Sequence, residues 1–285
     1  MSSKPVVVGV DGSEGSLRAA EWAAGEAARR KLALRIVSAP APLPRMPSPY
    51  VRESTIADAL RDAASQHLSL AAERAGEVTQ GLAIETGLLS GPPGIALEGC
   101  GPDASMLVLG ARGAGGFGTM TLGSVSRHAA AHASCPVVVV REETTAVRRE
   151  VVVGIRDPED AQEALALAFE EAALRGADLL VVHAWLWIPP GLHGRAGIAF
   201  DPEMISAAAS GQLDDLLSAW REKYPAVPVS PKVLHGHPAR ILAGLSARAD
   251  LTVLGKHSAP SLGSIWSVVL GHAHGPVAIV PSEPS

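Results

Sequence analysis

The sequence has little cysteine, no surplus of basic residues and no long apolar run. Two cysteines in 285 residues argue against a disulfide scaffold and favour a reducing cytoplasm. A formal net charge of −5 gives no basic footprint for nucleic acid. No stretch reaches about 18 apolar residues, and the opening MSSKPVVVGVDGS has no apolar signal core. We therefore expect a cytoplasmic protein that binds neither nucleic acid nor membrane.

Signatures of catalysis are also missing. The sequence holds no G-x-S-x-G elbow, and no Lys-Ser/Thr pair follows its glycine-rich segment as a Walker loop requires. No residue stands out as one that positions water for ATP hydrolysis. His128 and His132 have a spacing able to bind metal, but no third ligand lies in their segment. We predict no catalytic residue and no protein-bound metal, and at most slow ATP hydrolysis.

Apolar runs alternate with helix-compatible segments along the whole chain. Val6–Val10 is a continuous apolar run, typical of a parallel strand covered on both faces, and Leu32–Val37 follows a helical stretch. This alternation predicts an α/β fold with doubly wound parallel sheets. The length predicts two domains, which we place at residues 1–146 and 147–285.

The second half repeats the first. Gly9 and Gly154 stand 145 positions apart, and so do Gly110 and Gly255. Beyond the second pair the offset falls to 140, at which Ser124 matches Ser264. The two copies are thus aligned up to a glycine-rich loop, inside which the second copy is five residues shorter.

That loop lies in residues 106–141, between one buried strand and the start of a helix. Glycines let backbone N–H groups approach a ligand, and a helix start offers unpaired donors. Arg112 adds a positive charge, and Ser124 can cap the helix or bond a phosphate oxygen. Residues 113–118 also fit the dinucleotide fingerprint G-x-G-x-x-G, but the helix starts too late and residue 138 is valine instead of an acid. The segment predicts a polyanion site such as one for a nucleotide triphosphate.

The spacing Gly110-x2-Gly113-x9-Gly123-Ser124 resembles the nucleotide-binding signature of the universal stress protein family, and the repeat resembles its tandem form. The resemblance implies two tandem five-stranded parallel sheets with helices on both faces, a Rossmann-like fold. It also implies that ATP, with Mg²⁺, binds at the edge formed by strands one, two and four. Carried onto this chain, the binding residues are Gly9, Asp11, Val37, Ala39, Gly110, Ala111, Arg112, Gly113, Ala114, Gly115, Gly116, Gly123, Ser124 and Val125. Asp11 and the end of strand two would face adenine and ribose, and the loop with Ser124 would hold the phosphates.

The second half departs from this pattern. Arg156 stands where Asp11 stands in the first half, and Ser258 stands where Gly113 does. A shortened loop with one donor removed at Pro260 is a poor phosphate cradle. We interpret residues 147–285 as a degenerate copy that keeps the fold; the alternative is that Arg156, with Lys256 and His257, binds a different anion.

The expected function is that of an ATP-binding regulatory protein of the stress response. Slow ATP hydrolysis and a partner-binding module with a vestigial site remain alternatives. A homodimer and a regulatory protein partner are left open. The last strand of each copy needs cover for its edge, so we expect residues 137–141 and 277–281 to pair antiparallel.

Overall fold

The computed structural model describes residues 4–40, 53–113, 122–141, 147–157, 161–186, 202–256 and 264–282. The chain divides into two compact units. Unit 1 comprises Met1–Thr144 and Pro276–Pro281, and unit 2 comprises Thr145–Gly275 and Ser282–Ser285. The last strand of the chain thus belongs by its contacts to unit 1.

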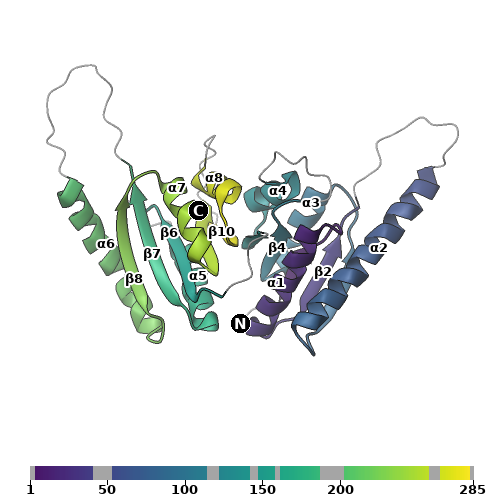
Figure 1. Cartoon of the computed structure of the whole chain (residues 1–285), viewed down its shortest axis with the longest axis horizontal. Helices are drawn as coiled ribbons and strands as arrows, with labels where there is room; N and C mark the ends of the chain where they lie inside the picture. The colour runs from purple at the N-terminus through teal and green to yellow at the C-terminus, as the bar shows by residue number, and fades with distance from the viewer. Residues whose placement is uncertain are drawn as a thin grey trace, which may run out of the picture. The chain divides into compact units, whose positions relative to one another are not determined.

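Unit 1 alternates strands and helices along the chain. Its elements up to residue 141 are β1 (Val6–Gly9), α1 (Glu14–Arg30), β2 (Leu34–Ser38), α2 (Glu53–Val78), β3 (Ile84–Leu88), α3 (Pro93–Glu98), a 3-10 turn (Gly101–Asp103), β4 (Met106–Gly110), α4 (Ser124–His132) and β5 (Val137–Val140). The five strands are parallel, in the order β3-β2-β1-β4-β5. Helix α1 packs on α2, and α3 packs on α4 (Figure 1). Because crossovers between parallel strands are right-handed, the two helix pairs cover opposite faces of the sheet.

Unit 2 repeats this arrangement with four parallel strands in the order β9-β6-β7-β8. Its elements are β6 (Glu150–Ile155), α5 (Gln162–Arg175), β7 (Asp178–Trp185), α6 (Pro202–Lys223), β8 (Val229–His235), α7 (Pro238–Leu245), a 3-10 turn (Ser246–Arg248), β9 (Leu251–Lys256) and α8 (Ile265–His272). The parallel α/β fold predicted from the sequence is confirmed in both units.

The composition of the strands explains why they lie at the centre of each unit. Every residue of β1, β4 and β5 is buried, as expected for apolar runs covered on both faces.

Each unit also contains a buried ion pair at the same place in the repeat. A buried carboxylate is costly unless a charged partner lies beside it. Glu26 is fully buried in α1 and accepts from Arg30 Nε at 2.6 Å, and Glu171 is fully buried in α5 and pairs with Arg175, at the same offset of 145.

The final strand, β10 (Val277–Pro281), pairs antiparallel with β5, with Ala278 opposite Val138. The antiparallel pairing predicted for residues 137–141 and 277–281 is therefore confirmed. Val277, Ala278 and Ile279 are at most 1% exposed, so the edge of β5 is covered by an apolar strand. A covered edge offers no row of unpaired backbone groups to other chains.

Helix α1 begins earlier than the sequence predicts. The sequence predicts a start at about Leu17 from the apolar pattern, with Ser13 or Ser16 as the candidate cap, whereas the helix begins at Glu14. Ser13 is the N-cap, and its hydroxyl accepts from the backbone N–H of Ser16 at 3.2 Å. This cap recruits a further turn that carries no apolar periodicity, which is why the apolar pattern alone places the start too late.

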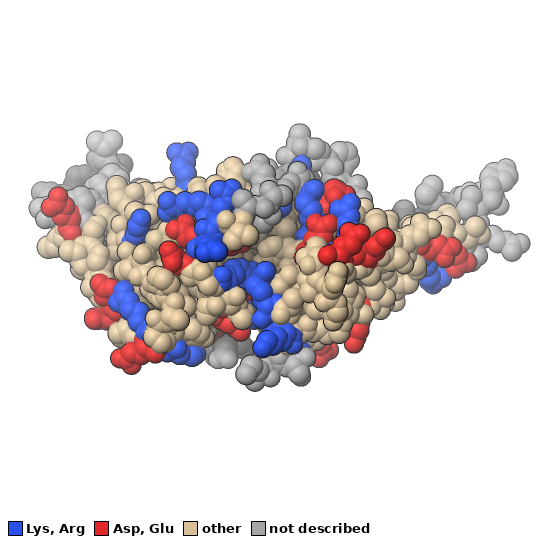
Figure 2. Space-filling view, turned by 60° about the horizontal axis from the view of Figure 1, so that its bottom comes forward, with Lys and Arg blue, Asp and Glu red and all other residues tan. Residues whose placement is uncertain are grey.

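No helix within the described ranges is both long enough and apolar enough to cross a membrane. Figure 2 shows Lys and Arg side chains lying among Asp and Glu side chains on one face of the molecule. Within unit 1, the Arg74 guanidinium reaches Glu14 at 2.8 Å and Glu21 at 3.1 Å. The face drawn in Figure 2 carries both signs of charge, in keeping with the small net charge.

Candidate functional site

A cavity of about 440 Å³ lies in unit 1, at the carboxyl ends of β1, β2 and β4. This is the edge of a parallel sheet at which ligands of α/β folds bind. The residues that line it are Gly9, Val10, Asp11, Ser16, Ser38, Ala39, Pro40, Leu60, Ala63, Ala64, His67, Pro93, Leu97, Leu109, Gly110, Arg112, Gly113, Gly123, Ser124, Val125 and Ser126. Residues from four helices and three strands of unit 1 therefore contribute to the wall of the cavity.

Most of the predicted binding residues within the described ranges lie on the wall of this cavity. They are Gly9, Asp11, Ala39, Gly110, Arg112, Gly113, Gly123, Ser124 and Val125. Val37 and Ala111 do not line it. Residues 114–116, predicted as Ala114, Gly115 and Gly116, lie outside the described ranges.

Val37 and Ala111 are held by the backbone of the sheet. Val37 is fully buried in β2, and its carbonyl accepts from Val10 N at 2.8 Å. Ala111 N donates to the Val140 carbonyl at 3.0 Å, and Ala111 O accepts from Gly123 N at 2.8 Å. The amides of Ala111 and Gly123 thus close the two ends of the glycine loop. A phosphate role for these two amides, as the sequence suggests, does not fit their hydrogen bonds.

The Asp11 carboxylate is oriented by the turn that follows β1. Its Oδ1 accepts from the Ser13 backbone N–H at 3.0 Å and from the Ser13 hydroxyl at 2.6 Å. Its other oxygen, Oδ2, lies so close to Gly113 that a Cβ at position 113 would overlap it. The first strand and the glycine loop therefore meet at this acid, and Gly113 is needed for the close approach.

The N-terminus of α4 is presented to the cavity. The helix begins at Ser124, and its N-cap Gly123 supplies no side-chain capping bond. The helix is tied to the end of β4, because the buried Ser126 hydroxyl donates to the Gly110 carbonyl at 2.7 Å. At Gly110 itself the chain passes α1 closely, and a Cβ there would lie 2.8 Å from the Gly15 carbonyl carbon. Ser124 is therefore the first helical residue and not the cap; of the two roles predicted for it, the one at a phosphate oxygen stays a prediction.

Helix α2 forms a wall of the cavity that sequence reasoning missed. Leu60, Ala63, Ala64 and His67 follow the spacing of one helix face, and all four line the cavity. The His67 ring lies against Gly12, where a Cβ would overlap the ring, and Gly12 has a φ of 80°. The helical spacing was visible in the sequence, but nothing in it tells which face of α2 turns toward the end of β1.

Comparison with sequence models of protein families shows to which family the chain belongs. The sequence model of the universal stress protein family matches residues 2–141 and again residues 148–281. The chain belongs to this family. The tandem form predicted from the sequence is confirmed by the two matches.

Named relatives agree over nearly the full length. Universal stress protein Rv2005c of Mycobacterium tuberculosis (strain ATCC 25618 / H37Rv) is 35% identical, covering 96% of each chain. Universal stress protein Rv1996 of the same strain is 33% identical, covering 98% of this chain and 96% of its own. Among solved structures, a universal stress protein from Archaeoglobus fulgidus DSM 4304 has a TM-score of 0.74 at 18% identity, covering 98% of this chain and 97% of its own. This last likeness shows the shared fold.

Unit 2 of this universal stress protein differs at the matching sheet edge. Arg156 follows β6 where Asp11 follows β1, and its Nε donates to Asp157 Oδ2 at 2.6 Å. Lys256 ends β9. Residues 257–263, which include His257, Ser258 and Pro260, lie outside the described ranges. Helix α8 begins at Ile265 with Ser264 as its N-cap, one position later than α4 begins in the aligned repeat.

Neither cysteine has the environment of a reactive thiol. Both are buried, and burial raises the pKa of Cys100 and raises that of Cys135 to about 11. A raised thiol pKa lowers the fraction of thiolate, which is the reacting species. At pH 8 we expect the thiols of the native protein to react with a disulfide reagent far more slowly than the thiols of the protein unfolded in denaturant. The unfolded chain should react with two equivalents of the reagent, one for each cysteine. Rapid reaction of a native thiol would contradict this assignment.

Proposed function

We propose that unit 1 binds ATP with Mg²⁺ in this cavity, and that the bound state acts as a regulatory signal in the stress response of the cytoplasm. The observation that carries the proposal is the meeting of Asp11, the glycine loop and the α4 N-terminus in one cavity at the carboxyl edge of the sheet. Its volume is within the range of small-molecule sites. Membership of the universal stress protein family supports an adenine nucleotide as the ligand.

Each part of ATP can be assigned to residues that line the cavity. The adenine ring would lie among the small and apolar residues Val10, Ala39 and Leu60, where aromatic surface is removed from water. A ribose hydroxyl would donate to Asp11, whose Oδ1 is already held by Ser13. The phosphates would lie at Ser124, where the first turn of α4 directs N–H groups and the positive end of its dipole toward the cavity.

Two charged groups favour a nucleotide that carries a metal ion. Arg112 lines the cavity beside Gly113 and supplies a fixed positive charge to phosphate oxygens. Asp11 supplies one carboxylate close to the same loop. Mg²⁺ binds through one or two carboxylates together with substrate phosphates. Asp11 would supply that carboxylate through Oδ2, which faces Gly113 of the loop, while Oδ1 accepts the ribose hydroxyl. When bound, the ion would neutralise phosphate charge on the loop side of Asp11.

Unit 2 would keep the fold but would not bind ATP. The position of the ribose acid carries Arg156, and Asp157 already neutralises part of its charge. A cation in this place cannot accept a ribose hydroxyl, and an anion would compete with Asp157 for the guanidinium. These contacts support one ATP per chain, in unit 1.

A second candidate function is slow ATP hydrolysis. It is favoured by His67, which lines the cavity on α2 and is a residue type able to orient or deprotonate water. A partner-binding module with a vestigial site is the third possibility.

Mass spectrometry of nucleotide released from the freshly purified protein separates the three. ATP alone supports the regulatory proposal. ADP together with steady phosphate release supports the hydrolase. If no nucleotide is released and none binds on addition, the cavity has another use and the proposal is wrong.

A further inference from the structure

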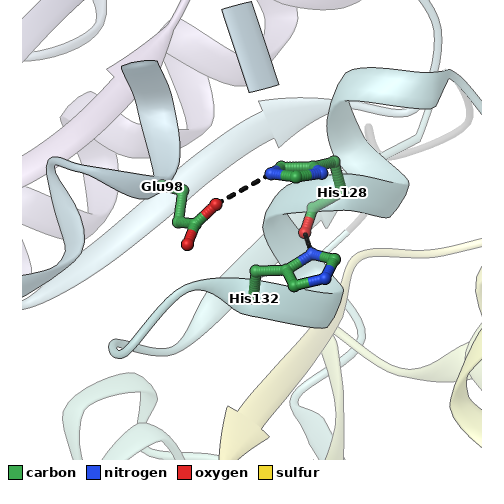
Figure 3. A group of neighbouring side chains, drawn as sticks. All are labelled: Glu98, His128 and His132. Carbon is green, nitrogen blue, oxygen red and sulfur yellow. Dashed lines mark hydrogen bonds and ion pairs between the residues drawn. The ribbon is translucent and has the colours of Figure 1, made fainter. Parts of the chain in front are cut away.

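Three metal-ligating side chains gather where α3 meets α4, and none of them lines the nucleotide cavity. They are Glu98 at the end of α3, and His128 and His132 one turn apart on α4 (Figure 3). One ligand atom from each lies within 4.8 Å of those of the other two. The sequence shows the histidine pair but no third ligand nearby; packing of α3 on α4 brings Glu98 from 30 positions away.

His128 is seated beside the carboxylate. Its Nε2 donates to Glu98 Oε2 at 2.8 Å, and the two side chains are 34% and 38% exposed. Gly94 lies one turn before Glu98 on α3, and a Cβ there would come within 3.0 Å of the His128 ring. The missing side chain at position 94 therefore lets the imidazole lie on α3 next to Glu98.

His132 is oriented by the backbone. Its Nδ1 donates to the His128 carbonyl at 2.9 Å. Because a carbonyl only accepts, the neutral ring carries its proton on Nδ1 and leaves the lone pair on Nε2. Histidines that bind metals are usually held in this way, with the second nitrogen donating to a carbonyl or a carboxylate. The two imidazole rings are stacked, with centroids 4.4 Å apart.

We propose that Glu98, His128 and His132 bind a divalent transition metal ion, with Zn²⁺ as the best match. Two histidines and one carboxylate, with water in the fourth position, are a known tetrahedral zinc set. Ligand atoms about 2.0–2.1 Å from such an ion stand roughly 3.4 Å apart. The ion would take the place of the proton that His128 Nε2 donates to Glu98: that proton leaves Nε2, the neutral ring carries its proton on Nδ1, and Nε2 offers its lone pair to the metal. The exposed His132 side chain would close the remaining distance.

The site would act as a cross-link between two helices. Pro93 and Leu97 of α3 and Val125 of α4 line the nucleotide cavity, whereas none of the three ligands does. A bound ion would therefore fix the packing of α3 on α4 from outside the cavity. Metal binding at this site would not require a nucleotide in the cavity, because the three ligands are not among its lining residues.

The test uses the full chain without an affinity tag, Zn²⁺ alone, and a chromogenic chelator as competitor. We expect one Zn²⁺ per chain with this site intact. Glu98→Gln and His132→Gln should each lower its affinity at least about tenfold, as removal of a ligand does at minimum. Co²⁺ should give the visible absorption of a tetrahedral centre in the wild type and lose it in both variants.

His272→Gln is the matched control. His272 is exposed on α8, and its Nδ1 bonds the Val268 carbonyl at 2.9 Å, as His132 bonds His128, but a valine replaces the second histidine. This variant should bind Zn²⁺ like the wild type. Circular dichroism without metal should show all three variants folded, since none of the replaced side chains is buried. If the wild type binds no Zn²⁺ at micromolar concentrations, or if Glu98→Gln and His132→Gln bind it equally well, the group is an ion pair only and the proposal is wrong.

Discussion

Replacing Gly113 by valine should weaken ATP binding at least about 100-fold, or about 2.7 kcal/mol, while the fold of unit 1 survives. Position 113 faces Asp11 Oδ2, and a Cβ there would overlap that oxygen. The branched side chain must therefore displace the carboxylate or occupy the space proposed for phosphate. The first result displaces the acid proposed for the ribose, and the second fills the space proposed for the phosphates. Gly113 is exposed, so no buried packing is lost.

Gly87→Val is the matched control for this substitution. Gly87 lies in β3 of the same unit and does not line the cavity. A Cβ there would meet only Val37 Cγ1, at 3.9 Å, which is an ordinary contact. We expect this variant to bind ATP like the wild type. Unchanged ATP affinity in Gly113→Val, measured by calorimetric titration, would show that the phosphates do not lie at this loop.

Expression of residues 1–146 alone should give a homodimer or an aggregate. This fragment lacks β10, the strand that pairs with β5 through Ala278 and Val138. Without it, the buried apolar strand Val137–Val140 becomes an open edge. Such an edge pairs readily with another chain, and a second copy of the fragment offers an equivalent strand.

Sedimentation velocity would distinguish the outcomes for the fragment. A dimer that retains ATP binding would show that β10 serves as cover for the edge and that the ligand needs unit 1 only. A stable, soluble monomer with full ATP binding would show that the edge needs no partner. In that case, β10 would not be required to cover β5, and its proposed structural role would be wrong.

The fold could be predicted from the sequence because its signals are local and repeated. Continuous valine runs, such as Val6–Val8 and Val137–Val140, mark strands covered on both faces, and the offset of 145 shows that the pattern occurs twice. The glycine spacing around Gly110 identified the family. The sequence offered Ser13 as a candidate cap, but the start of α1 was placed at about Leu17 because the turn that this cap sets carries no apolar periodicity.

The walls of the site could be predicted only in part, because they depend on which faces of the helices meet. His67 comes from the middle of α2, far from any motif, and turns toward Gly12 only through packing of the helix. Glu98 joins His128 for the same reason. Gly123, by contrast, matched the motif, but its amide bonds the Ala111 carbonyl. Spacing in the sequence indicates where the loop is, and the hydrogen bonds show which of its amides remain available to a ligand.

Isothermal titration of the full chain with ATP, in the presence of Mg²⁺, tests the central claim most directly. Unit 1 has Asp11, the glycine loop and the α4 start around one cavity, whereas unit 2 carries Arg156 at the position of the acid. We predict a single site with a stoichiometry of one ATP per chain, lost in Gly113→Val. Two equivalent sites per chain, or a single site that is unaffected by Gly113→Val, would contradict the assignment of ATP to unit 1.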